Sequence, residues 1–273
     1  MCCRICSFVL TTAGMWLVGI TSCCAQGLIF SLPEDRTGVE YEGTVTQETV
    51  RPELEAGREA LTWTRELSIK SVGREDAEFS GKVQSCRWIE IRVVTGTKGV
   101  SGIDAGPVGA RIYKVLVPES KVIDTAVDAD TIPNSVLPIV KGYRRLGEEQ
   151  IEPIHSRGLV VYPTLCLLEN YKSPSLVSGS ASIENVSGNE TYECRHLKGR
   201  NVRERTESRS TNDGEFWVSR DVPFGLAGWS VTVTRESKGS AEDRARFRQI
   251  GSVTSEMRLR RIVRTAESEL ITD

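Results

Sequence analysis

The stretch "GEFWVSRDVPFGLAGWSVTVTRE", residues 214–236, has the clearest structural pattern in this chain. Pro223 fixes its own φ and Gly225 permits a left-handed conformation, so the Val-Pro-Phe-Gly segment is typical of a tight turn. After the turn, the apolar residues of 229–233 alternate with Ser and Thr, as in a strand that buries one face. The stretch therefore predicts an antiparallel hairpin.

The same alternation recurs along the chain between dense turn signals, which is the signature of antiparallel strands. It occurs in the runs 38–50, 60–73, 84–96, 110–120, 191–200 and 245–263. No repeat of fixed period accompanies it, which disfavours a propeller or a solenoid. We predict a mainly β fold, a curved antiparallel sheet or incomplete barrel, in a single domain over residues 26–273.

Two segments depart from the alternation. Residues 121–150 have helical character in parts, but Pro133 and Pro138 exclude a long helix, so we predict a small helical insertion there. Residues 169–190 are rich in Ser, Gly and Asn, a composition that predicts an exposed loop.

The N-terminus has the layout of a secretory signal peptide, which we assign to residues 1–25. Arg4 precedes an apolar run over residues 8–20, and small residues follow. That run is shorter than the stretch of about 20 residues that spans a bilayer. Cleavage after Ala25 would release a soluble protein. Alternatively, the segment that ends at Cys23 resembles a bacterial lipobox, in which case Cys23 would be lipidated and would anchor the protein to a membrane. Both readings place the protein in the periplasm or outside the cell.

The composition of the chain limits the classes of partner that we expect it to bind. The chain has 273 residues, of which 39% are hydrophobic and 26% charged, and its net charge is −2. These values are ordinary for a globular protein and provide no basic field that would attract nucleic acid. We expect no nucleic-acid partner and no transmembrane span in the mature chain.

Three cysteines follow the predicted leader: Cys86, Cys166 and Cys194. An exported protein favours disulfides, and the pair that we prefer is Cys166–Cys194. Each of the three would serve equally well as a small buried hydrophobe.

The sequence holds few candidates for chemistry. Its only histidines are His155 and His196, and no Gly-x-Ser-x-Gly elbow is present. His196 lies in an alternating strand, so we expect a solvated position, and His155 in a loop is the better candidate for a base. Cys194 and His196 share a strand face but supply only two ligands, too few for zinc. The glycine-rich run 96–109 lacks the Gly-Lys-Ser/Thr ending of a phosphate loop. We therefore predict no catalytic residue, metal or cofactor.

Four segments resemble a group of uncharacterised secreted proteins from planctomycete-type bacteria. They are "LIFSLPEDRTGVEYEGTV" (28–45), "SIKSVGREDAEFSGKVQSCRWIEIRV" (68–93), "ARIYKVLVPES" (110–120) and "GEFWVSRDVPFGLAGWSVTV" (214–233). One departure is the opening turn, because Arg36 and Thr37 stand where the group tends to have Gly and an aromatic residue. The predicted curved sheet is also similar, at the level of fold, to LolA/LolB-type periplasmic lipoprotein carriers, which hold acyl chains in the concave side of an incomplete barrel.

These observations favour a non-catalytic envelope protein of binding or carrier type. Its ligand would be an apolar molecule or a partner segment, such as a lipid, a lipoprotein or another envelope component. We expect Trp63, Trp88, Trp217 and Trp229 on or near the concave face, although ordinary sheet core would also account for each of them. A structural or interaction module without a cavity is the alternative, and a hydrolase that uses His155 is a third hypothesis.

Overall fold

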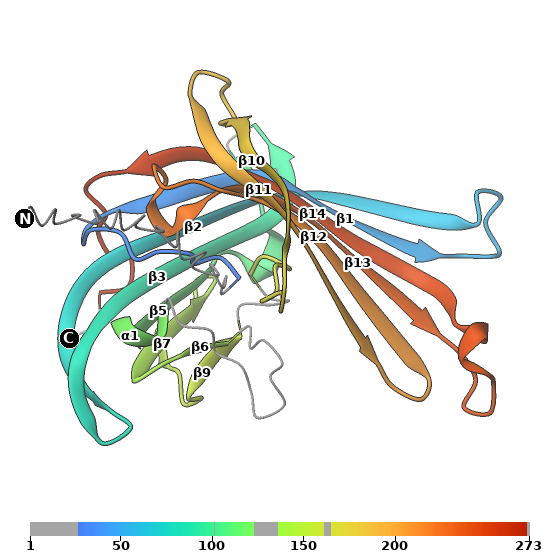
Figure 1. Cartoon of the computed structure of the whole chain (residues 1–273), viewed down its shortest axis with the longest axis horizontal. Helices are drawn as coiled ribbons and strands as arrows, with labels where there is room; N and C mark the ends of the chain where they lie inside the picture. Colours follow the sequence, from blue (N-terminus) through green and yellow to red (C-terminus); the bar gives the residue numbers. More distant parts are fainter. Residues whose placement is uncertain (1–26, 101, 123–135, 161–164, 272–273) are drawn as a thin grey trace, which may run out of the picture.

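The protein is built around one large antiparallel sheet, seen in the computed structural model of Figure 1. The structure describes residues 27–100, 102–122, 136–160 and 165–271. Helix within these residues is limited to one α-helix of 4 residues and three 3-10 turns. The prediction of a mainly β protein is therefore confirmed, and the sheet of 12 strands is open, not closed into a barrel.

The sheet consists of two groups of strands, each in chain order, with one later strand between them. The first group comprises β1 (Gly38–Val50), β2 (Arg58–Phe79), β3 (Lys82–Gly99), β4 (Gly102–Asp104), β5 (Arg111–Pro118), β7 (Lys141–Leu146) and β8 (Glu152–Pro153). The second group comprises β10 (Ser175–Glu184), β11 (Thr191–Glu204), β12 (Ser208–Val218) and β13 (Leu226–Ser237). The last strand, β14 (Arg248–Val263), lies between β13 and β1 and joins the two groups.

The remaining elements are short. They are η1 (Gly106–Val108), α1 (Glu119–Val122), η2 (Pro223–Gly225), η3 (Arg244–Arg246) and a separate two-stranded sheet of β6 (Val136–Pro138) and β9 (Gly158–Val160). None of the helices in the described part of the chain has the length and apolar character needed to cross a membrane.

The hairpin predicted for residues 214–236 is confirmed as β12, η2 and β13. Phe224 and Gly225 both have positive φ, 63° and 87°, and together they reverse the chain. The residues after the turn alternate between buried and half-buried positions, as the sequence pattern predicted. Phe216 pairs directly with Trp229, so these two side chains share one face of the sheet.

The helical insertion predicted for 121–150 is wrong in the part that is described. Helix α1 ends at Val122, residues 123–135 lie outside the described residues, and β6 and β7 follow. Strand β7 pairs with β5 from Leu116↔Lys141 to Arg111↔Leu146. Pairing satisfies the backbone groups at the edge of β5, and this tertiary gain outweighs the weak local preference for helix.

Residues 169–190 were predicted to be an exposed loop, and most of them are exposed, but Ser175–Glu184 form the edge strand β10. Its pairing with β11 is irregular, with register shifts around Ser178. Backbone hydrogen bonds to β11 hold β10 in place, and its Ser- and Gly-rich side chains add little packing. The segment therefore has no apolar alternation from which a strand could be predicted.

The two faces of the sheet are covered by different segments. We call the face that carries Tyr41, Ile91 and Trp229 the inner face, because all three side chains belong to the main core. Residues 27–33 and 165–171 lie on it. Phe30 and Tyr171 both pack on Phe216, with ring centroids 5.6 and 5.7 Å apart. We call the opposite side the outer face.

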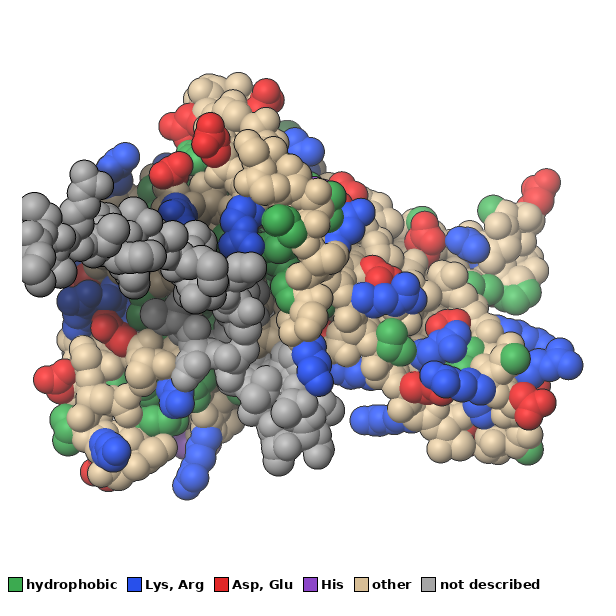
Figure 2. Space-filling view, viewed as in Figure 1, with side chains coloured by type: hydrophobic (Ala, Val, Ile, Leu, Met, Phe, Trp, Pro, Cys, Tyr) green, Lys and Arg blue, Asp and Glu red, His purple; other side chains and the backbone are tan. Residues whose placement is uncertain are grey.

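Part of the sheet extends beyond this core. In Figure 1 the hairpins that connect β1 to β2, β11 to β12 and β13 to β14 project to the right, away from both termini. Figure 2 shows side chains of both charge signs spread over this projecting region. Ion pairs such as Arg209–Glu236 (2.6 Å) and Arg244–Glu204 (2.8 Å) join them.

Candidate functional site

A pocket of about 550 Å³ opens on the inner face, where the covered core gives way to the projecting hairpins. We call it the inner-face pocket. Its apolar wall consists of Val45, Trp63, Leu167 and Val253. Its volume is typical of sites for small ligands.

The register of the strands explains how this wall forms. Val45 pairs with Trp63, and Arg65 pairs with Thr95, so these side chains share the inner face of β1, β2 and β3. Gly96 allows the opposite rim to approach, because a Cβ there would lie 1.9 Å from the carbonyl oxygen of Asp104. The β3–β4 hairpin can therefore fold back onto β3 and close one side of the pocket.

Arg65 is the polar centre of the inner-face pocket. Only 8% of its surface is exposed, and its Nε donates to Thr95 Oγ1 at 2.8 Å. Its Nη1 is buried and has no hydrogen-bond partner among the described residues. Burial, together with the nearby charge of Arg111, lowers the pKa of Arg65 to about 10. The guanidinium therefore remains charged at neutral pH while one of its donors is unused.

A second buried arginine on the same face shows the ordinary arrangement. Arg87 is 1% exposed, and its Nη1 donates to Pro33 O at 2.9 Å and to Ser71 Oγ at 2.8 Å. Its Nε and Nη2 both lie 2.8 Å from a carboxylate oxygen of Glu119. The charge of Arg87 is thus compensated within the fold, as buried charges require, whereas no carboxylate in the described part of the chain pairs with Arg65.

The other charged groups of the pocket leave it net cationic. Arg235 also lines it, and among its described lining residues the sole acid is Asp104. One carboxylate oxygen of Asp104 accepts from the backbone N–H of Gly106 at 2.9 Å, and no ion pair joins Asp104 to Arg65 in the described structure. The pocket combines an aromatic and aliphatic wall with a buried guanidinium.

The four tryptophans predicted for a binding face do not converge on one site. Trp63 lines the inner-face pocket. Trp229 lies on the same face but is only 1% exposed, and its Nε1 donates to Cys166 O at 3.1 Å. Trp88 and Trp217 neighbour Ile89 and Phe216, whose side chains are in the core, so both point to the outer face.

The two outer-face tryptophans have polar surroundings. Trp88 donates from Nε1 to Glu75 at 3.0 Å, and Lys141 lies 5.2 Å from its ring. Trp217 stacks on His196 at 4.6 Å, and His196 Nε2 lies 3.0 Å from Glu215. His196 is therefore a half-buried strand residue in contact with the Glu215 carboxylate.

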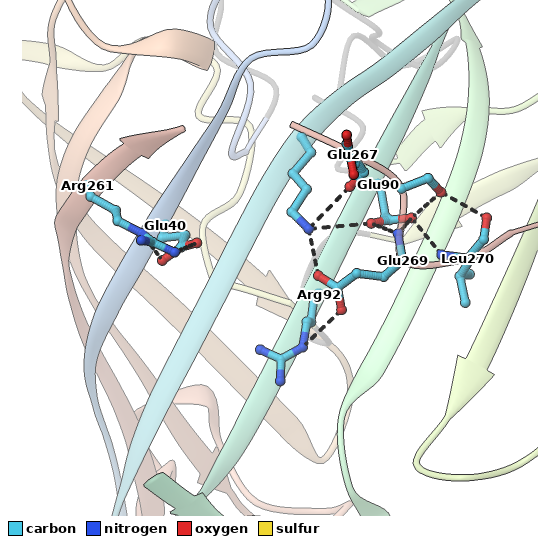
Figure 3. Close-up of polar contacts among 9 residues, drawn as sticks. Glu40, Glu90, Arg92, Arg261, Glu267, Glu269 and Leu270 are labelled. Carbon is cyan, nitrogen blue, oxygen red and sulfur yellow. Dashed lines mark hydrogen bonds and ion pairs between the residues drawn. The ribbon is translucent and has the colours of Figure 1, made fainter. Parts of the chain in front are cut away.

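The outer face carries a charged network that holds the C-terminal segment 264–271 (Figure 3). Glu90 is 1% exposed, and its carboxylate accepts from the backbone N–H groups of Glu269 (3.0 Å) and Leu270 (3.2 Å) and from Ser268 Oγ (2.7 Å). Lys70 Nζ lies 3.8 Å from Glu90 and 2.6 Å from Glu269. Each charge has partners within the fold, so this cluster is a structural anchor.

The disulfide predicted between Cys166 and Cys194 is not formed. Cys86, Cys166 and Cys194 are all free and buried. Cys166 Sγ donates to Leu168 O at 3.8 Å and Cys194 Sγ to Tyr192 O at 3.4 Å, so each thiol has its own acceptor. Burial raises the pKa of Cys166 to about 12, and both cysteines pack as core hydrophobes. Cys23 and the predicted signal peptide lie outside the described residues.

The structure gives His155 no catalytic partner among the described residues. It is exposed in the loop between β8 and β9, and no hydrogen bond or ion pair connects it to another described side chain. The described residues also contain no group of three His, Cys, Asp or Glu side chains placed to hold a metal ion. The hydrolase hypothesis therefore has no geometric support in the described part of the chain.

Comparison with known proteins gives no assignment: no protein family matches the chain, and no curated protein matches it. The resemblance to secreted planctomycete-type proteins and to LolA/LolB-type carriers remains a prediction.

Proposed function

We propose that this chain is a non-catalytic binding protein of the bacterial cell envelope, which holds an apolar ligand in the inner-face pocket. The observation that carries the proposal is the open pocket of about 550 Å³, whose wall includes Trp63 and three aliphatic side chains. Elsewhere on the inner face, protein segments occupy the corresponding space, as residues 165–171 do over Trp229. Apolar surface that the fold leaves uncovered in such a pocket is typical of ligand sites.

Export from the cytoplasm is part of the proposal, and it rests on the sequence pattern of residues 1–25. The same pattern leaves a soluble protein or anchoring through Cys23 as alternatives. Lipids and lipoproteins of the envelope are the apolar molecules that such a protein would meet.

The proposal is tested by native mass spectrometry and lipid extraction of the protein purified from its own envelope. We expect a bound apolar molecule in the wild-type protein and its loss in Val253→Trp, because an indole at this position fills the pocket. Ser252→Trp is the matched control: Ser252 precedes Val253 on β14 and faces the opposite side of the sheet. A wild-type protein without bound ligand, or equal loading of both variants, would contradict the proposal.

The second hypothesis, an interaction module without a ligand, is favoured by the exposed edge strand β10. Leu176 and Val177 are 55% and 49% exposed there, and an edge strand offers backbone groups to a partner strand. This hypothesis would be supported if the wild-type protein carried no apolar molecule and instead bound another envelope protein through this edge.

A further inference from the structure

The inner-face pocket holds one feature that an apolar ligand alone does not explain. Arg65 is more than nine-tenths buried, lines the pocket and has an Nη1 without a hydrogen-bond partner among the described residues. A purely hydrocarbon ligand would supply no acceptor to this guanidinium and would remove the little solvent contact that Arg65 retains, which opposes binding.

The surrounding charges point to the missing partner. Arg235 adds a second positive charge to the lining, and Arg111 is close enough to influence Arg65 electrostatically. Asp104 is the one acid in the described lining, and its carboxylate bonds to the backbone N–H of Gly106. The local field therefore favours an anion beside Arg65.

The geometry also sets the shape of the ligand. Arg65 and Trp63 are two residues apart on β2 and face the same side, so the guanidinium lies directly beside the aromatic wall. Val45 and Val253 extend the apolar surface from there toward the projecting hairpins. An acidic group at Arg65 would thus place an attached hydrocarbon chain along Trp63, Val45 and Val253.

We propose that the ligand of the inner-face pocket is an amphipathic anion, whose carboxylate or phosphate pairs with Arg65 and whose hydrocarbon chain packs on Trp63, Val45 and Val253. This inference rests on the proposed binding function and specifies the class of its ligand. A guanidinium binds carboxylate and phosphate oxygens with the same donor geometry, so either head group fits.

Titration calorimetry with four simple probes below their micellar concentrations tests the inference. The probes are decanoate, decyl phosphate, 1-decanol and inorganic phosphate. For the wild-type protein we expect decanoate and decyl phosphate to bind at least about tenfold more tightly than 1-decanol, since one charge-assisted hydrogen bond contributes a factor of this size. Inorganic phosphate is expected to bind more weakly than decyl phosphate by at least about the same factor, because it lacks the chain.

Arg65→Gln should remove the preference for the anionic probes. The affinity for 1-decanol should stay within about threefold of the wild-type value, a smaller change than the roughly tenfold that one charge-assisted hydrogen bond contributes. Arg244→Gln is the matched control, because it makes the same change of charge on an exposed side chain outside this pocket. Arg65→Lys keeps the charge and should retain part of the preference. Circular dichroism shows whether each variant is folded, and the wild-type comparison of probes does not depend on any variant.

The possible outcomes separate the two proposals. Equal binding of decanoate and 1-decanol by the wild-type protein would overturn the anion inference and leave the proposed function standing. Equal binding of inorganic phosphate and decyl phosphate would identify a site for a free anion and overturn the amphipathic ligand. Binding of none of the four probes would count against the proposed function itself.

Discussion

The anchor at Glu90 gives the sharpest stability prediction. We expect Glu90→Gln to detach segment 264–271 from the outer face of the sheet. The carboxylate accepts three hydrogen bonds from this segment, two of them from the backbone N–H groups of Glu269 and Leu270. All three donors reach the same carboxylate oxygen, Oε2, so a glutamine oxygen can still accept from them, but without the charge, and its NH₂ group replaces the other oxygen, which faces Glu269 N and Lys70.

The magnitude follows from the loss of charge on the acceptor. Hydrogen bonds to a charged acceptor contribute about 1.5–3 kcal/mol each and those to a neutral acceptor about 0.5–1.5 kcal/mol, so the substitution weakens each of the three bonds by about 1 kcal/mol. The segment should therefore lose about 2–4 kcal/mol of local stability, and the Glu269 and Leu270 amides should exchange about thirtyfold to a thousandfold faster. Hydrogen exchange followed by mass spectrometry of the C-terminal peptide measures this directly.

The control for this experiment is Glu269→Gln. The Glu269 side chain is 37% exposed, and its ion pairs with Lys70 and Arg92 lie at the surface, where such pairs contribute little. We expect less than a fivefold change in exchange, corresponding to less than about 1 kcal/mol. If Glu90→Gln left the exchange of these amides unchanged, the buried carboxylate would not be the group that holds the segment.

Three further predictions concern the fold. Arg36→Gly should stabilise the protein by about 0.5–1 kcal/mol in urea unfolding, because Arg36 has a φ of 62° that glycine adopts without strain; a loss of stability would contradict this reason. Gly199→Ala should destabilise it by about 1–3 kcal/mol, because the added Cβ would lie 2.1 Å from Cγ of the Tyr171 ring, whereas Gly179→Ala, with no atom within 4 Å of the added Cβ, should change it by less than about 0.5 kcal/mol. Burial raises the pKa of Glu169, so the folded protein holds this proton more tightly than the unfolded chain does. The resulting stabilisation is fully present below the ordinary pKa of 4.5 and is lost as the pH rises through the higher pKa of the folded state. Urea unfolding between pH 4 and pH 7.5 should therefore show a smaller loss of stability with rising pH in Glu169→Gln than in the wild-type protein, and equal profiles would refute the assignment.

The sequence predicted the fold where side chains alternate strictly. Residues 214–236 contain both a turn with fixed φ preferences and a strand with one apolar face, so local chemistry determines the hairpin. The prediction of helical structure within 121–150 is wrong for residues 141–146, because "KGYRRL" has no strong local preference and becomes a strand only by pairing with β5. Strand β10 was missed for the same reason, since its exposed Ser- and Gly-rich residues carry no periodic signal.

The candidate site was predictable in part. Trp63 was expected on a binding face, and it does line the inner-face pocket. Alternation did not reveal which tryptophans other segments cover, and Trp229 lies beneath Cys166 from a distant part of the chain. The signal for Arg65 was present, because this charged residue occupies an apolar phase of the run 60–73, between Trp63 and Leu67. A charged residue at a position where the alternation predicts a buried apolar side chain indicates a buried charge, which needs a partner of opposite charge.

The position of β14 between β13 and β1 has a consequence for the order of assembly. Strands β1 to β8 and β10 to β13 can each pair with their neighbours as the chain is synthesised, but β14 is made later and must enter between two finished edges. Strand β14 pairs with β1 on one side, where Val263 lies opposite Gly38, and with β13 on the other, where Arg258 lies opposite Gly228. The pairs between β13 and β14 are local in sequence, whereas those between β1 and β14 join the two ends of the described chain. Contacts as distant as the latter form slowly, so docking of β14 on β1 should limit the folding rate. Until then β1 and β13 are unpaired edges, at which a strand from another copy could insert and begin domain exchange or aggregation.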